Sequence, residues 1–383
     1  MTDFYDLDAL LTDEQRLIRK TVRDFVSREA LPDMGRHWEA GTFPVELIAR
    51  MGELGLFGPS LSGHGLPGLD NLSYGLMMQE LERGDSGLRS FASVQGGLVM
   101  YPIWRYGSEE QKERWLPALA SGERIGCFGL TEPDHGSDPG SMKTRARQDG
   151  GDWIIHGSKM WITNASLADV SLIWASTEEG LRGFLVEKGT PGLEARPVPA
   201  KMSLRASDTS EISLDEVRVP ESARLPEAEG LGGPLSCLNQ ARYSIAWGTL
   251  GAALACFEEA RDYAGERVQF GAPLARFQLT QQRLAEMLGG ITQAQLLLHR
   301  LAQLKDEDAA SPAQISLAKR NNCALALDVA RSARQLLGAA GISLEHQSGR
   351  HLCNLEAVIT YEGTHEIHTL IVGEALTGIR AFA

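Results

Sequence analysis

The stretch EISLDEVRV, residues 211–219, separates this sequence from an all-helical one. Apolar and polar residues alternate along it in two registers, which is the period of a strand with one buried face. Short β-branched or aromatic runs precede it at residues 153–155, 159–163, 170–175 and 183–187, with Gly, Asn and Asp between them. Several short strands with turn signals predict a small β sandwich or barrel in the middle of the chain.

Helical patterns begin on the N-terminal side of this β segment. The tetrads TDEQ at residues 12–15 and SEEQ at residues 108–111 are capping boxes, and both precede amphipathic runs. Residues 58–71 are rich in Gly and Pro and predict a loop between helices. We therefore expect an N-terminal helical domain at residues 1–125 and a central β domain at residues 126–232.

The last part of the chain, residues 233–383, returns to a helical period. A heptad-like stripe runs through Ala246, Leu250, Ala253, Phe257, Ala260 and Ala264. SPAQ at residues 311–314 begins another helix with Pro at its first position. Long stripes of this kind predict a C-terminal helical bundle domain. The charged residues Lys319, Arg331 and Arg334 are expected on solvated or interface faces.

The composition argues against several classes of protein. The chain has 383 residues, a formal net charge of -13 and a pI near 5.2, which disfavours nucleic acid or an anionic membrane as partner. Its five cysteines form neither a C-x-x-C pair nor a Cys/His cluster, so we expect no metal site and a reduced, cytoplasmic environment. The N-terminus lacks the apolar core of a signal peptide, and the longest uncharged stretch, residues 243–257, is too short to cross a bilayer.

The run YEGTH, residues 361–365, carries a candidate general base. Glu362 stands between an aromatic ring and a glycine. Apolar neighbours raise the pKa of a carboxyl toward working pH, and a glycine leaves room for a substrate. The alternative is a surface glutamate that caps a turn.

Four further segments suggest ligand contacts, each with a plainer alternative. FGLTEPDHGSD, residues 128–138, predicts a tight turn that holds a flat polar ring or an anion, or a plain loop. WIT, residues 161–163, predicts an indole wall beside that ligand, or a core tryptophan. RVQFG, residues 267–271, offers an arginine for a phosphate, or a surface ion pair. QLLGAAG, residues 335–341, ends a helix in small residues, but it is not a G-x-G-x-x-G after a strand, so a Rossmann fold is excluded.

These five segments resemble the acyl-CoA dehydrogenase family in order and spacing, over nearly all of the chain up to Phe382. The resemblance implies an N-terminal helical domain, a central β domain and a C-terminal four-helix bundle, with FAD between the last two, and a homotetramer. Glu362 falls on the position of the catalytic base in most of the family. The residues that would line FAD, some of them across a subunit interface, are Phe128, Gly129, Leu130, Thr131, Gly136, Ser137, Trp161, Ile162, Thr163, Arg267, Phe270, Gln278, Gln335, Leu336, Leu337, Gly338, Ala339, Thr364, His365 and Glu366.

A narrower resemblance, to the glutaryl-CoA dehydrogenase branch, rests on residues 80–95, ELERGDSGLRSFASVQ. A distal substrate carboxylate must be paired when buried, and Arg89 matches the arginine that binds it. The alternative is an arginine on a helix surface. The residues implied to contact substrate are Glu82, Arg89, Ser90, Ser137, Leu235, Ser236, Cys237, Leu238, Asn239, Gln240, Ala241, Arg242, Tyr361 and Gly363. Leu88, the glycines at 96–97 and Ala339 depart from the branch and leave the pocket width open.

The reaction implied by this resemblance is the oxidation of glutaryl-CoA by FAD with loss of CO2, giving crotonyl-CoA, with electrons passed to an electron-transfer flavoprotein. Glu362 would remove the proton next to the thioester carbonyl. Three alternatives remain at this level. They are a short-chain acyl-CoA dehydrogenase or oxidase, a glutaryl-CoA dehydrogenase that does not decarboxylate, and a helical scaffold without chemistry.

Overall fold

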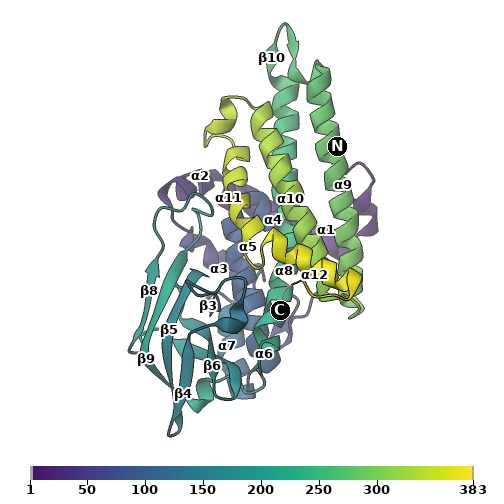
Figure 1. The fold of residues 1–383 in the computed structure, drawn as a ribbon. Coiled ribbons are helices and arrows are strands. Elements are labelled where there is room, and N and C mark those ends of the chain that lie inside the picture. Colours follow the sequence, from purple (N-terminus) through teal and green to yellow (C-terminus); the bar gives the residue numbers. More distant parts are fainter. Residues whose placement is uncertain (1–2, 382–383) are drawn as a thin grey trace.

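The computed structural model describes residues 3–381, and Figure 1 shows a curled sheet at one end of a mainly helical molecule. Residues 1–2 and 382–383, which were included in the predicted outer domains and in the resemblance up to Phe382, lie outside the described residues. The N-terminal helices are α1 (Asp13–Phe25), α2 (Leu31–Ala40), α3 (Ile48–Glu53), α4 (Asn71–Gly84), α5 (Ser86–Ser93), α6 (Tyr101–Tyr106) and α7 (Glu109–Ala120).

Local sequence signals set the ends of these helices. The side chains of Thr12 and Ser108 accept from the backbone N–H of Gln15 and Gln111, so both predicted capping boxes are confirmed. The predicted loop at residues 58–71 contains a small hairpin, β1 (Ser62–Gly63) and β2 (Leu66–Pro67), which the sequence did not reveal.

The central domain is one seven-stranded sheet. Its strands are β3 (Gly126–Gly129), β4 (Arg145–Asp149), β5 (Asp152–Thr163), β6 (Val170–Thr177), β7 (Gly180–Glu187), β8 (Leu193–Pro197) and β9 (Thr209–Pro220), in the order β3-β6-β4-β5-β9-β8 with β7 beside β6. Residues 153–155 and 159–163, expected as separate runs, are one strand, because β5 continues through Gly157 with a shift in register. The sequence missed β3, β4 and β8, which are short.

The two alternating registers of residues 211–219 have a physical cause. Ile212 and Leu214 are buried before the switch, and Val217 and Val219 are buried after it. Between them the pairing with β5 shifts register, and Glu216 has a φ of 51°. One extra residue on β9 forms a bulge, so apolar side chains on both sides of it still face the same core.

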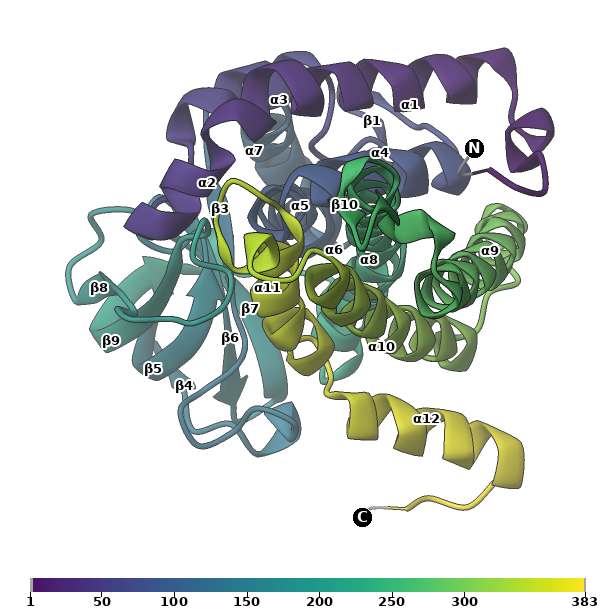
Figure 2. The same cartoon turned by 90° about the horizontal axis from the view of Figure 1, so that it is seen from above.

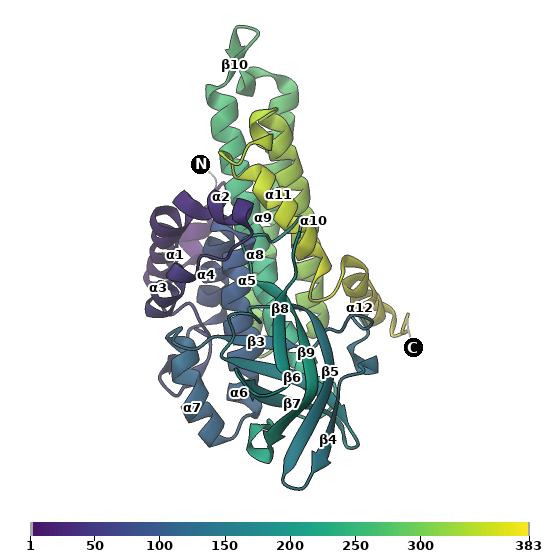
Figure 3. The ribbon, with the colours of Figure 1, turned by 90° about the vertical axis from the view of Figure 1, so that its left-hand side faces the viewer.

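The C-terminal domain is a bundle of α8 (Gly232–Glu266), α9 (Gln278–Asp306), α10 (Pro312–Leu336) and α11 (Ser348–Thr360). The hairpin of β10 (Val268–Gln269) and β11 (Ala272–Pro273) joins α8 to α9, at the end of the bundle far from the sheet (Figure 3). The last helix, α12 (His365–Thr377), projects from the side of the bundle (Figure 2). The predicted α8 stripe from Ala246 to Ala264 is buried throughout.

One charge expected on a solvated or interface face is in the core. Lys319 on α10 is 1% exposed, whereas the side chain of Arg331 is half exposed beside Asp328 and Glu356, as expected. Within residues 3–381, no helix has the length and apolar character that a bilayer crossing requires.

Candidate active site

The loop between α11 and α12 carries Glu362 on a left-handed backbone. Glu362 has a φ of 54°, and Gly363 follows with a φ of 100°. A β-carbon at position 363 would lie 2.8 Å from Nε2 of His368. The sequence predicted that this glycine makes room for a substrate. In the structure it serves the backbone conformation and makes room for a buried histidine.

The carboxyl of Glu362 has the properties of a base. Its Oε2 is buried and has no hydrogen-bond partner among the described residues. Burial raises the pKa of this carboxyl above its ordinary value, against the opposing charges of Arg89, Lys319 and Arg242. A carboxylate that is unpaired and less stable in its charged form takes up a proton readily.

The backbone around Glu362 is held by two buried cations. Nζ of Lys319 donates to the carbonyl oxygens of Ile359 at 3.3 Å, Tyr361 at 3.0 Å and Gly363 at 2.8 Å. Nε of Arg242 donates to the carbonyl oxygen of Glu362 at 2.9 Å. The resemblance implied that Arg242 contacts substrate, and the structure shows it bonded to the loop between α11 and α12, residues 361–364, which is called the base loop below.

Lys319 is a site residue that the sequence reading missed, although a signal was present. It follows Ile315 by four residues and precedes Cys323 by four, and both of these are buried. Positions four apart share one helix face, so the lysine stands on the buried stripe of α10.

Arg89 lies in the interior on α5, with an exposed fraction of 0%, so the alternative of a surface arginine is wrong. Its Nε donates to Oε2 of Glu82 at 2.6 Å, and its Nη2 donates to the hydroxyl of Tyr361. Burial by itself lowers the pKa of this guanidinium, but Glu82 and Tyr361 raise it above its ordinary value. Its Nη1 is buried without a partner among the described residues, and is therefore available to an anion.

Gly248 on α8 makes the Glu82–Arg89 pair possible. A β-carbon at this position would lie 2.1 Å from Oε2 of Glu82 and 3.0 Å from Nε of Arg89. Ser90 is buried next to Arg89 in the chain, and Tyr74 is buried nearby with its pKa raised to about 12 by desolvation. Neither Gly248 nor Tyr74 was predicted from the sequence as part of the site.

The start of α8, residues 235–242, presents two faces. Cys237 and Ala241 are fully buried in the core, and burial raises the pKa of the Cys237 thiol to about 12. The Ser236 hydroxyl lies 2.8 Å from that of Tyr106. Contact with a ligand is therefore left to the partly exposed members of this segment, which are Leu235, Ser236, Leu238, Asn239 and Gln240.

Two of the predicted cofactor segments are fastened together. Glu132 accepts from the backbone N–H of Lys143 at 2.5 Å and from Nζ of Lys159 at 2.9 Å. Burial by itself raises the pKa of Glu132, but the Thr144 N–H, which donates at 2.8 Å, together with Lys143 and Lys159 lowers it to about 2. Nζ of Lys159 also donates to the Leu130 carbonyl at 3.1 Å. The pair thus ties the turn at residues 128–138 to the strand that carries the predicted indole wall.

That indole is not in the core. Trp161 is 57% exposed and has a φ of 63°, while Ile162 beside it is buried. The core-tryptophan alternative is therefore wrong, and a flat aromatic face lies open beside the turn of Phe128 to Ser137. The Met160 N–H donates to the Thr131 carbonyl at 2.8 Å and keeps the two segments adjacent.

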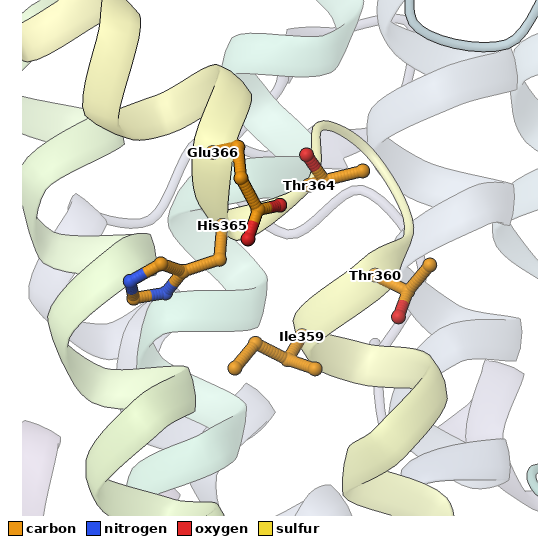
Figure 4. A pocket seen from close by; sticks show the side chains of 5 residues that line it. All are labelled: Ile359, Thr360, Thr364, His365 and Glu366. Carbon is orange, nitrogen blue, oxygen red and sulfur yellow. The ribbon is translucent and has the colours of Figure 1, made fainter.

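A cavity of about 360 Å³ opens at the start of α12, directly after the base loop (Figure 4). Thr364 caps this helix, and its side chain accepts from the Ile367 N–H at 3.3 Å. The backbone N–H groups at a helix N-terminus favour an anionic group, and the Thr364 and His365 side chains lie beside them together with the Glu366 carboxylate. The lining residues are Ile359, Thr360, Thr364, His365 and Glu366, so the last three predicted cofactor residues do lie together.

The remaining predicted cofactor residues are elsewhere in the chain. Arg267 and Gln278 flank the β10–β11 hairpin, Phe270 lies in its turn, and residues 335–339 lie at the end of α10, while the hairpin is at the end of the bundle far from the sheet (Figure 3). Phe270 is 96% exposed. A single chain does not bring these residues to the turn at 128–138.

An N-terminal helical domain, a curled central sheet and a C-terminal helical bundle, in this order along the chain, are the architecture of the flavin-dependent acyl-CoA dehydrogenase class. The family models agree over the whole fold. The acyl-CoA dehydrogenase N-terminal domain matches residues 12–123, the middle domain residues 127–217 and the C-terminal domain residues 228–377. The chain belongs to the acyl-CoA dehydrogenase family.

Individual relatives cover the full length. Glutaryl-CoA dehydrogenase from Mycobacterium smegmatis is 54% identical with a TM-score of 0.98, covering 100% of this chain and 99% of that chain. A structure of such an enzyme in complex with FADH2 is 53% identical with a TM-score of 0.99 and the same coverage. The mitochondrial short-chain specific acyl-CoA dehydrogenase of Bos taurus is 37% identical over 97% of this chain and 92% of its own length.

The family depends on FAD, and the residues present fit that cofactor. The open face of Trp161 can stack on a flat ring, Lys159 and Glu132 hold the turn at 128–138 beside it, and the N–H groups at the start of α12 favour a phosphate. FAD supplies the redox chemistry when bound, and the protein supplies position and proton transfer.

Proposed function

We propose that this acyl-CoA dehydrogenase oxidises glutaryl-CoA and releases CO2 and crotonyl-CoA. The observation that carries the proposal is Arg89, a buried guanidinium with one unpartnered nitrogen, bonded to the residue before the base. A buried cation of this kind selects an acyl chain that ends in a carboxylate. The similarity to glutaryl-CoA dehydrogenases supports the same substrate.

The first step is proton transfer to Glu362. The Oε2 atom removes the proton on the carbon next to the thioester carbonyl, and the raised pKa of the carboxyl lowers the cost of that transfer. FAD would supply the acceptor for the β-hydrogen, which leaves the substrate as hydride. The product at this stage is glutaconyl-CoA.

Decarboxylation follows from the position of the second carboxylate. Once the double bond is conjugated with the thioester, the electrons of the breaking C–CO2 bond delocalise into the thioester carbonyl. The protonated Glu362 returns its proton to the resulting carbanion and crotonyl-CoA forms. The Tyr361 hydroxyl lies at the carboxylate end of the proposed acyl chain, since it accepts a hydrogen bond from Arg89.

The proposal includes a homotetramer, electron transfer to an electron-transfer flavoprotein, and a cytoplasmic location. Exposed apolar residues at the β10–β11 hairpin and the start of α9 support assembly, since Val268 and Phe270 on the hairpin and Leu279 on α9 all face solvent in one chain. Assembly would also bring the predicted cofactor residues near that hairpin to the site of another subunit. Sedimentation of the purified flavoprotein tests this part.

A short-chain acyl-CoA dehydrogenase is the second candidate, because a short-chain enzyme is 37% identical over nearly the whole chain. Such an enzyme requires an apolar pocket where Arg89 lies. A glutaryl-CoA dehydrogenase that stops at glutaconyl-CoA is the third form, and CO2 measured per flavin reduced separates it from the decarboxylating one.

The decisive experiment is anaerobic mixing of the flavin-loaded protein with glutaryl-CoA. We expect bleaching of the flavin absorbance and the appearance of crotonyl-CoA. The variant Glu362→Gln should bind the same ligand but bleach about 10²–10⁴-fold more slowly, which is the usual contribution of a general base. Bleaching by butyryl-CoA but not by glutaryl-CoA would refute the proposal.

A further inference from the structure

The three carbonyl groups at the base each accept from a buried cation. Those of Tyr361 and Gly363 accept from Nζ of Lys319, and that of Glu362, between them, accepts from Nε of Arg242. Both cations come from the bundle, Lys319 from α10 and Arg242 from α8. No other lysine within residues 3–381 donates to three backbone carbonyls.

The backbone held in this way is not one that the sequence prefers. Glu362 is not a glycine, yet its φ is 54°, in the left-handed region where the β-carbon crowds the carbonyl. Such a conformation persists only where surrounding contacts over-determine it. A change in the φ of Glu362 would move its carboxyl group, because the side chain is attached at the Cα about which φ turns.

We propose that Lys319 is a positioning residue for proton abstraction, which fixes the direction of the Glu362 carboxyl by holding the carbonyls on both sides of it. The inference rests on Glu362 as the base in the proposed function. Lys319 does not touch the reacting atoms. It acts through the peptide groups of the loop.

The chemistry of a lysine fits this task. An ammonium group has three N–H donors, and all three are used on the carbonyls of Ile359, Tyr361 and Gly363. No donor is left for the carboxylate, so Oε2 of Glu362 remains free to take a proton. The planar fork of an arginine cannot direct three donors to oxygens that converge on one point.

The charge of Lys319 also acts on the base, but it is one of several. The titratable and charged groups near Glu362 are Tyr74 on α4, Arg89 on α5, Arg242 on α8, Lys319 and Cys323 on α10, Tyr361 at the end of α11 and the neutral His368 on α12. A lysine that only supplied charge would be replaced by arginine without loss. A lysine that holds carbonyls would not.

The test compares Lys319→Met and Lys319→Arg with Lys201→Met as a matched control. Lys201 also donates from a partly buried amine to a backbone carbonyl, that of Ser207, in a part of the chain without a proposed role in the reaction. Three quantities are measured on flavin-loaded protein: single-turnover bleaching by glutaryl-CoA across pH, the dissociation constant of crotonyl-CoA, and amide hydrogen exchange of the peptide spanning residues 359–364.

We expect Lys319→Met and Lys319→Arg each to slow bleaching by about tenfold or more, with crotonyl-CoA binding within about threefold of the parent. Exchange at residues 359–364 should accelerate, including the Tyr361 amide that donates to the Ala357 carbonyl at 2.9 Å. The pH at which bleaching is half-maximal should rise for Lys319→Met and stay near the parent value for Lys319→Arg. Lys201→Met should match the parent.

Three results would overturn the inference. They are bleaching by Lys319→Met within about twofold of the parent, full rescue by Lys319→Arg, and loss of amide protection throughout the bundle in both variants, which would make the lysine a packing residue only. If none of the acyl-CoA substrates bleaches the flavin of the parent protein, the proposed function fails instead. The exchange measurement still reports whether Lys319 holds the loop.

Discussion

The buried pair of Arg89 and Glu82 allows substrate selection to be separated from stability. Arg89→Met alone leaves the Glu82 carboxylate in the interior with only the Ser86 hydroxyl at 2.8 Å. Breaking a buried pair in this way costs about 3–5 kcal/mol of folding free energy. The double variant Glu82→Gln/Arg89→Met removes both charges together, so it should keep most of the stability that the single variant loses.

The effect of the double variant on catalysis follows from what Arg89 offers. Its Nη1 is a buried donor without a partner among residues 3–381, and truncating one partner of a buried charge pair costs about 2–5 kcal/mol. A loss of about 3 kcal/mol corresponds to a fall of about 150-fold in kcat/KM for glutaryl-CoA. Butyryl-CoA has no distal carboxylate, so its kcat/KM should change by less than about threefold.

The assay is steady-state turnover with an artificial electron acceptor, using both substrates with the parent and the double variant, after thermal unfolding has shown that both are folded. The ratio of the two kcat/KM values is the quantity that decides. Equal losses on glutaryl-CoA and butyryl-CoA would refute the assignment of Arg89 to the distal carboxylate. They would leave Arg89 as a structural partner of Glu82.

Three further predictions concern the surroundings of the site. Gly248→Ala should destabilise the protein by about 1–3 kcal/mol and lower turnover, because its new β-carbon meets a buried carboxylate, whereas Gly265→Ala on the same helix has open space and should be neutral or stabilising in thermal melts. Burial lowers the pKa of His368 to about 3, whereas the unfolded chain protonates this residue near pH 6.5. The folding free energy that this group contributes is therefore present above pH 6.5 and should fall by about 1.4 kcal/mol per pH unit toward pH 3. The variant His368→Gln should remove this slope in denaturant titrations. Lys159→Met should weaken FAD binding by about tenfold or more in a fluorescence titration, because it leaves the Glu132 carboxylate in the turn at 128–138 without its cation. Unchanged affinity would show that this pair does not position the turn.

The parts of the fold that were predictable have local causes. The predicted capping boxes at Thr12 and Ser108 and the predicted helix start at Ser311 each depend on four adjacent residues, and the structure has all three; the structure adds that Ser311 is a capping box too. The register switch on β9 was visible because burial alternates on each side of the bulge. The short strand β8, with mostly exposed side chains, has no such pattern and was not predicted.

The site was predictable where it rests on a motif and hidden where it rests on long-range contact. Glu362 and Arg89 are 273 positions apart, and only a family resemblance joined them, since no periodicity links such distant residues. Lys319 is hidden for the opposite reason, because a charged residue in a helix is usually solvated and its carbonyl partners lie forty residues further on. Gly248 matters only through the space it leaves for two other helices.

The packing of Gly248 against Glu82 and Arg89 also limits the order in which mutations can change the substrate specificity of this protein. Replacing Arg89 first strands a negative charge, replacing Glu82 first strands a positive one, and enlarging Gly248 first collides with both. Each single step lowers fitness through stability before any new acyl chain is accommodated. The proposed preference for a carboxylate-ended thioester would therefore be inherited as a block of three positions, and lineages that lose it are expected to have exchanged all three.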